Sequence, residues 1–148
     1  MISPVLSAPM LQVLLVEDSL TQALLMKNVV QNSHQLELIG VARDGEEALQ
    51  FLRRTGEFVH AAKPDLILLD LNMPKKDGFE VLQEMKQDDE LKSIPVIVFT
   101  TSERGEDIVN SYKSGASTFI TKPTRLDELA STVENIVNYW THARLLPH

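Results

Sequence analysis

The chain has 148 residues, 43% of them hydrophobic, which fits one domain of ordinary size with its own core. The absence of cysteine excludes disulfides and thiolate metal sites, and a net charge of −7 argues against broad attraction to nucleic acid or anionic lipid. The first ten residues lack the basic start of a signal peptide, and no apolar run reaches membrane-spanning length. We therefore expect a soluble cytoplasmic protein that binds neither nucleic acid nor membrane.

Five short apolar runs, rich in Val, Ile and Leu, alternate with segments of helical spacing. In chain order the runs lie at 12–16, 36–42, 65–69, 95–99 and 118–120. Most lack strict alternation of apolar and polar residues, which is typical of strands covered on both faces of a parallel sheet. Strand–helix alternation repeated five times predicts an α/β fold, doubly wound, with helices on both faces of the sheet.

Capping signals indicate where the helices between these strands begin. Four residues are followed three positions later by Gln, Glu or Asp, namely Ser19 by Gln22, Asp44 by Glu47, Asp77 by Glu80 and Thr124 by Asp127. These pairs match a capping box or its looser Asp form. The last helix carries its apolar residues on one face and is predicted to end at Trp140. The predicted domain therefore covers residues 11–140, with an extension at 1–10 and a tail at 141–148.

Three acidic residues follow two of the predicted strands. Glu17 and Asp18 come directly after the first strand, and Asp70 directly after the third. Strand carboxyl ends meet at one edge of such a sheet, so these carboxylates face one another and need a cation or a shared proton. Oxygen ligands alone favour Mg²⁺, with Mn²⁺ or Ca²⁺ as substitutes. Glu17 and Asp18 taken alone fit equally well as helix-capping acids, but Asp70 ends a different strand and favours a metal site.

A hydroxyl and an ammonium group follow the fourth and fifth strands. They belong to Thr100 and to Lys122, which precedes Pro123. Together with the acids they suit phosphoryl transfer, because the metal and Lys122 neutralise phosphoryl oxygens and Thr100 donates a hydrogen bond to another oxygen. Asp70 is then the nucleophile that forms an acyl phosphate. An alternative role for Lys122 is a salt bridge to Asp70 in the resting protein, which is compatible with the first role.

With these residues in place, the sequence resembles the receiver domain of the two-component response-regulator family. The spacings of 30 residues from Asp70 to Thr100 and 22 more to Lys122 match that family. Further matches are Glu17, Asp18, Pro123 and the stretch 70–78, which contains Asn72, Pro74 and Gly78. The resemblance covers roughly residues 11–140.

The resemblance implies a flavodoxin-like five-stranded sheet with strand order 2-1-3-4-5. It implies phosphotransfer from a histidine kinase to Asp70, with Mg²⁺ bound by Asp18, Asp70 and the backbone carbonyl of Asn72, and with Glu17 assisting. The protein is then a phosphoacceptor that assists its own phosphorylation and dephosphorylation, and is not otherwise an enzyme. An aspartyl-phosphate hydrolase is an alternative, but it usually needs an acid at position 72. A flavin carrier of the same fold is a further alternative, but its phosphate needs a Gly- or hydroxyl-rich loop where this chain has Glu17 and Asp18.

The resemblance also assigns structural and switching roles. Thr100 and Phe119 are the implied switch pair, Pro74 and Gly78 are implied structural residues, and the Lys122–Pro123 peptide bond is implied to be cis. Thr101 stands where the family usually has Ala or another small residue, so access to the phosphorylation site is expected to be narrower.

A narrower resemblance, to the stand-alone regulators of cyanobacterial phytochrome kinases, rests on four segments, 53–63, 72–78, 100–102 and 140–147. It implies a phytochrome-type histidine kinase as partner. The length leaves no room for a DNA-binding output domain, so we expect output by protein contact, self-association or onward phosphotransfer. Trp140, Leu145 and Leu146 favour a homodimer through the last-helix side. The alternative is a tail that folds back over its own core.

Overall fold

The computed structural model describes residues 10–73 and 75–145, with the backbone alone for 142–145. The strands are β1 (Leu11–Val16), β2 (Leu36–Ala42), β3 (Leu66–Leu69), β4 (Val96–Thr100) and β5 (Thr118–Thr121). The helices are α1 (Leu20–Gln31), α2 (Gly45–Arg53), α3 (Gly78–Lys86), α4 (Gly105–Lys113) and α5 (Leu126–Leu145), with a short 3-10 turn, η2 (Gly56–Phe58).

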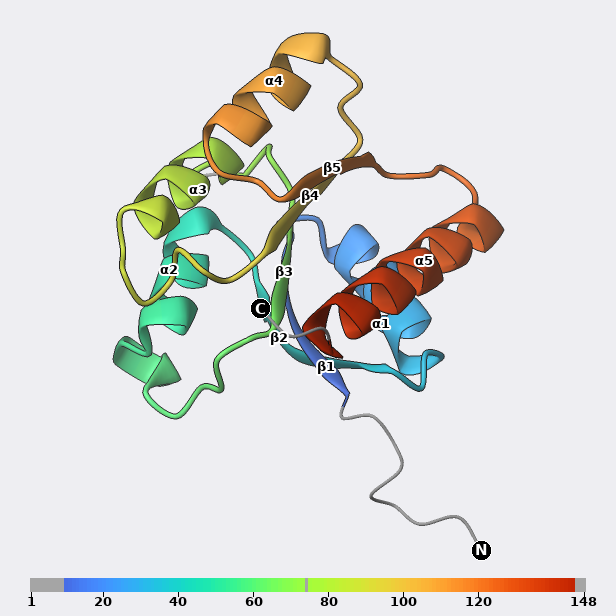
Figure 1. The fold of residues 1–148 in the computed structure, drawn as a ribbon, viewed down its shortest axis with the longest axis horizontal. Coiled ribbons are helices and arrows are strands. Elements are labelled where there is room, and N and C mark those ends of the chain that lie inside the picture. The colour runs from blue at the N-terminus through green and yellow to red at the C-terminus, as the bar shows by residue number, and fades with distance from the viewer. Residues whose placement is uncertain (1–9, 74, 146–148) are drawn as a thin grey trace, which may run out of the picture.

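The five strands form one parallel sheet in the order β2-β1-β3-β4-β5. Helices α1 and α5 lie on one face of this sheet, and α2, α3 and α4 lie on the other (Figure 1). The predicted doubly wound, flavodoxin-like α/β fold is confirmed. None of the described helices is long and apolar enough to cross a bilayer.

Two apolar cores, one on each face of the sheet, explain why the central strands show no clear alternation. Successive residues of β1 point to opposite faces, so that Leu14 packs with α2 and α3 whereas Val13 packs with α1 and α5. All four residues of β3 and all five of β4 are buried. A strand buried on both faces reads as a continuous apolar run.

Three of the four predicted caps are present. The side chains of Ser19, Asp44 and Asp77 each accept a hydrogen bond from the backbone N–H three residues later. Asp77 forms a full capping box, because Glu80 accepts a hydrogen bond from the Asp77 N–H in return. The prediction for Thr124 is wrong, since α5 begins at Leu126 and Asp127 instead accepts hydrogen bonds from the Arg125 guanidinium.

The predicted end of the last helix at Trp140 is also wrong, whereas the predicted domain bounds of 11–140 stay a prediction. Helix α5 continues to Leu145. Residues 141–145 contain neither Gly nor Pro, whereas Pro147 disfavours helical geometry at the residue before it. Trp140 packs against the core between the sheet, α1 and α5. The alternative of a tail that folds back over its own core stays a prediction. Leu146 lies outside the described residues, as does the side chain of Leu145.

Candidate phosphoacceptor and metal site

The three predicted carboxylates come together at the carboxyl edge of the sheet. Val16 pairs with Leu69 across β1 and β3, so the residues that follow each strand are neighbours. The Asp70 N–H donates a hydrogen bond to the Val16 carbonyl at 3.0 Å. One carboxylate oxygen from each of Glu17, Asp18 and Asp70 lies within 4.8 Å of the other two. This spacing is suitable for shared coordination of one cation.

The three acids differ in exposure and in how firmly they are held. Glu17 is 2% exposed, Asp70 is half-buried and Asp18 is exposed. The Ser19 N–H donates to Glu17 Oε2 at 3.1 Å, and the Leu71 N–H donates to Asp70 Oδ1 at 2.8 Å. The described residues offer Asp70 Oδ2 no hydrogen-bond donor, so this oxygen remains available to a ligand.

Lys122 is buried next to the acids and pairs with Glu17. Its side chain is 5% exposed, and its Nζ forms an ion pair with Glu17 Oε1. The alternative prediction, a resting salt bridge between Lys122 and Asp70, is wrong, because Lys122 pairs with Glu17. A buried ammonium needs a counter-charge, and buried Glu17 supplies it. The Lys122 N–H also donates to the Thr100 carbonyl at 2.6 Å, which joins the ends of β4 and β5.

The pKa of Glu17 responds to its burial and to the charges around it. Burial raises the pKa of Glu17 above its ordinary value, and the nearby charge of Asp70 raises it further. The hydrogen bond and charge of Lys122 and the Ser19 N–H partly offset this effect on the pKa. A divalent cation at the site favours the ionised carboxylate for the same reason that Lys122 does.

The residues present fit a hard divalent cation. All three clustered donors are carboxylate oxygens, and the exposed Asp18 leaves one side of the site open to water. Mg²⁺ binds through a few carboxylates while keeping several water ligands. Asn72 is exposed in the loop after β3, and the role of its backbone carbonyl as a ligand stays a prediction.

Thr100 is fully buried at the end of β4 and belongs to a hydrogen-bonded loop that no sequence motif indicates. Its Oγ1 accepts a hydrogen bond from the Ser102 N–H at 3.4 Å. The Ser102 hydroxyl donates to Asp107 Oδ2 at 2.6 Å, and the Thr121 hydroxyl donates to the Ser102 carbonyl at 3.3 Å. Ser102 and Asp107 are five residues apart, a spacing that matches no capping motif. Thr101 is exposed, and its effect on access stays a prediction.

Phe119 lies on the edge strand β5, half-buried against the core beneath α2 and α3. Its backbone N–H donates to the Tyr112 hydroxyl at 3.1 Å, so α4 is tied to the strand edge. This contact could not be predicted, because no motif surrounds Tyr112. The switch role of Thr100 with Phe119 stays a prediction.

The implied cis peptide bond is wrong for this structure. The described residues contain no cis peptide bond, and the Lys122–Pro123 bond is therefore trans. The trans isomer is the more stable form of an X–Pro bond in the absence of other constraints. The cis assignment rested on resemblance alone. Pro74, the other proline with an implied role, lies outside the described residues.

Gly78 is required by a close approach of two backbone segments. Its N–H donates to the Leu71 carbonyl at 2.9 Å, which closes the loop after Asp70. A Cβ at this position would lie 2.7 Å from the Asp70 carbonyl oxygen and 2.9 Å from Leu71 Cα. The predicted structural role of Gly78 therefore has a direct steric cause.

We expect Gly78→Ala to lower the free energy of unfolding by about 1–3 kcal/mol, the usual cost of overpacking. Gly105→Ala is the matched control, because a Cβ there meets no atom within 4 Å and Ala favours a helix. Urea unfolding of both variants measures the difference. Equal stability of the two variants would contradict the steric argument.

Residues 13–134 match the family model described as response regulator receiver domain. The chain belongs to this family. Response regulator Rcp1 of Synechocystis sp. is 42% identical over 141 residues, which are 95% of this chain and 96% of Rcp1. This receiver protein is therefore a response regulator that matches almost the whole length of Rcp1.

Two solved structures are similar to this receiver domain over nearly their full lengths. The phosphorylated cyanobacterial phytochrome response regulator RcpA has a TM-score of 0.85 at 42% identity, over 94% of this chain and 99% of RcpA. The Mn²⁺-bound form of Rcp1 has a TM-score of 0.81 at 43% identity, over 93% and 99% of the respective chains. The narrower resemblance to cyanobacterial phytochrome regulators is confirmed.

Proposed function

We propose that this receiver domain accepts a phosphoryl group on Asp70 from a histidine kinase and signals through protein–protein contact. The observation that carries the proposal is the set of three strand-end carboxylates within 4.8 Å of one another beside a buried lysine. Asp70 is the one of the three whose oxygen Oδ1 is held by the next backbone N–H while Oδ2 stays open. A carboxylate fixed in this way is oriented for attack.

In the reaction, an Asp70 carboxylate oxygen forms a bond to phosphorus while the bond from phosphorus to the kinase histidine nitrogen breaks. Lys122 exchanges Glu17 for a phosphoryl oxygen, and Thr100 donates its hydroxyl hydrogen to another. Lys122 and Thr100 are joined by a backbone hydrogen bond, which keeps the two groups side by side at the ends of β5 and β4. The domain in this way assists both gain and loss of the phosphoryl group without being a conventional enzyme.

We assign the cation to Mg²⁺, held by Glu17, Asp18, Asp70 and the carbonyl of Asn72. When bound, it neutralises charge on the phosphoryl oxygens. Chelation with EDTA is expected to abolish labelling from acetyl phosphate, and restoring Mg²⁺ to recover it. Asp18→Ala should weaken cation binding at least tenfold, because it removes one of three charged ligands, whereas Asp89→Ala, at a distant exposed acid, should not. Full labelling without any divalent ion would refute the assignment.

The proposed donor is a phytochrome-type histidine kinase. The support is the similarity, across almost the whole chain, to a regulator that is described as a phytochrome response regulator. Phosphotransfer rates from a phytochrome-type kinase and from unrelated kinases, measured side by side, test the assignment. We expect the phytochrome-type kinase to transfer at least tenfold faster, and a preference for an unrelated kinase would remove the claim.

We further propose a cytoplasmic homodimer that does not bind DNA. Helix α4 exposes Val109 and Tyr112 and helix α5 exposes Tyr139, with exposed fractions of 51%, 49% and 65%, and these two helices flank the edge strand β5 (Figure 1). Exposed aromatic residues are enriched in interfaces, and a symmetric dimer uses the same patch twice. Sedimentation of the full chain and of a chain truncated after Thr141, with and without phosphorylation, tests this proposal. If the full chain and the truncated chain are both monomers with and without phosphorylation, the homodimer is excluded.

A further inference from the structure

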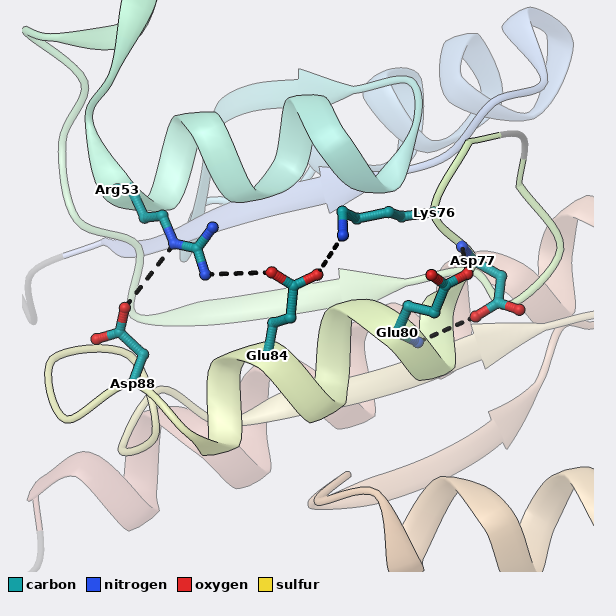
Figure 2. Close-up of polar contacts among 6 residues, drawn as sticks. All are labelled: Arg53, Lys76, Asp77, Glu80, Glu84 and Asp88. Carbon is teal, nitrogen blue, oxygen red and sulfur yellow. Dashed lines mark hydrogen bonds and ion pairs between the residues drawn. The ribbon is translucent and has the colours of Figure 1, made fainter.

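Two consecutive lysines in the loop between Asp70 and α3 form ion pairs with acidic residues of the neighbouring helices. The Lys76 ammonium lies 2.5 Å from Glu84 Oε2 on α3, and the Lys75 ammonium lies 3.6 Å from Asp44 Oδ2 at the start of α2. Figure 2 shows Lys76 reaching from the loop back along α3 to Glu84. Both ion pairs therefore tie the loop that carries Asn72 to a helix.

The backbone of the loop is held at the same place. The Gly45 N–H donates to the Lys76 carbonyl at 3.2 Å, and a Cβ at Gly45 would lie only 2.3 Å from that carbonyl oxygen. Only glycine allows α2 to approach this closely. The hydrogen bond from Gly78 to Leu71 closes the base of the loop. The loop that carries Asn72 is therefore fixed at its base and at Lys76.

Glu84 is itself positioned by a second cation. The Arg53 guanidinium on α2 lies 3.4 Å from Glu84 Oε1 and 3.9 Å from Asp88 Oδ2. Each Glu84 oxygen thus has its own cationic partner, as Figure 2 shows. The contact with Glu84 holds the pKa of Lys76 above its ordinary value, and the same contact holds the pKa of Glu84 below its own. Both groups are therefore charged at neutral pH.

We propose that Lys76 is a positioning residue, whose ion pair with Glu84 fixes the loop so that the backbone of Asn72 is presented to the divalent cation. The inference rests on the proposed cation site. Charge alone predicts the opposite effect, because an ammonium has the same sign of charge as the cation and its removal cannot weaken cation binding by electrostatics. The sign of the effect therefore separates positioning from simple electrostatics.

The test is a titration of the full-length protein with Mn²⁺, followed by electron paramagnetic resonance of the free ion. We expect Lys76→Met to bind Mn²⁺ about two- to fivefold more weakly, the effect of losing one partly exposed ion pair. Glu84→Gln should weaken binding similarly, and the double variant should be no weaker than either single variant. Lys92→Met is the matched control, because Lys92 pairs with the exposed Asp89 at 3.0 Å on another loop.

A second measurement needs no metal. The Gly78 amide proton should exchange faster in metal-free Lys76→Met than in the metal-free wild type, with no comparable change in Lys92→Met. Unchanged or tighter Mn²⁺ binding by Lys76→Met overturns the proposal, provided that Asp18→Ala lowers the affinity. If Asp18→Ala leaves Mn²⁺ affinity unchanged, the cation site itself is wrong, and the positioning role toward it is overturned as well.

Discussion

Asp70→Asn is expected to abolish phosphorylation of the protein completely. The amide that replaces the carboxylate is not a nucleophile at neutral pH and cannot form an acyl phosphate. The fold should persist, because the amide oxygen still accepts the hydrogen bond that the Leu71 N–H now donates to Asp70 Oδ1. Removing one of three clustered negative charges also relieves repulsion with Glu17 and Asp18. Stability without metal should therefore be equal to that of the wild type or slightly higher.

The measurement is incorporation of labelled phosphate from acetyl phosphate and from a phosphorylated kinase. Asp89→Asn is the matched control, since it makes the same chemical change at a side chain that is 93% exposed. We expect labelling at background for Asp70→Asn and at the wild-type level for Asp89→Asn, with both variants showing wild-type far-ultraviolet circular dichroism. Undiminished labelling of a folded Asp70→Asn protein would show that Asp70 is not the phosphoacceptor.

The parts of the fold that follow from local sequence were predictable. Apolar runs with no alternation predicted a sheet that is buried on both faces, and the rule that parallel strands end at one edge correctly predicted that Glu17 and Asp70 are neighbours. Capping pairs located three helix starts correctly. The extension of α5 to Leu145 was missed because the apolar stripe ends at Trp140, although nothing before Pro147 terminates a helix.

The pairing of charged groups was not predictable in the same way. Lys122 follows β5, which does not adjoin β1 in the sheet, and whether its ammonium meets Glu17 or Asp70 depends on side-chain rotamers across the sheet edge. The contacts of Lys76 with Glu84 and of Tyr112 with the Phe119 N–H depend on how separate elements pack. Such contacts follow no spacing rule, because they join elements whose relative positions are set only by tertiary structure.

Lys122→Met is expected to destabilise the metal-free protein by about 3 kcal/mol at neutral pH, the usual cost of leaving one partner of a buried ion pair without the other. The variant keeps the length and apolar contacts of the lysine stem but leaves Glu17 buried beside the charge of Asp70. Urea unfolding in EDTA measures the loss. Glu17→Gln combined with Lys122→Met should recover most of the stability, since neither buried charge then remains.

The loss of stability in Lys122→Met is expected to depend on pH. The pKa of Glu17 is already raised by burial, and removing Lys122 takes away the largest influence that lowers it, so the pKa rises further. An acid whose pKa is higher in the folded state binds more protons there than in the unfolded state. The stability of Lys122→Met should therefore increase as the pH falls toward the ordinary pKa of glutamate, and decrease as the pH rises through the folded value.

Mg²⁺ should stabilise Lys122→Met more than the wild type, because the cation supplies the counter-charge that the lysine no longer provides. Asp70 in this variant should still accept a phosphoryl group in the presence of Mg²⁺, but the phosphorylation-induced change at Thr100 and Phe119 should be weaker. Amide exchange at Phe119 before and after phosphorylation reports that change. A variant as stable as the wild type at neutral pH, with a wild-type response of Phe119 to phosphorylation, would show that Lys122 serves neither as the counter-charge of Glu17 nor as the ligand of the phosphoryl group.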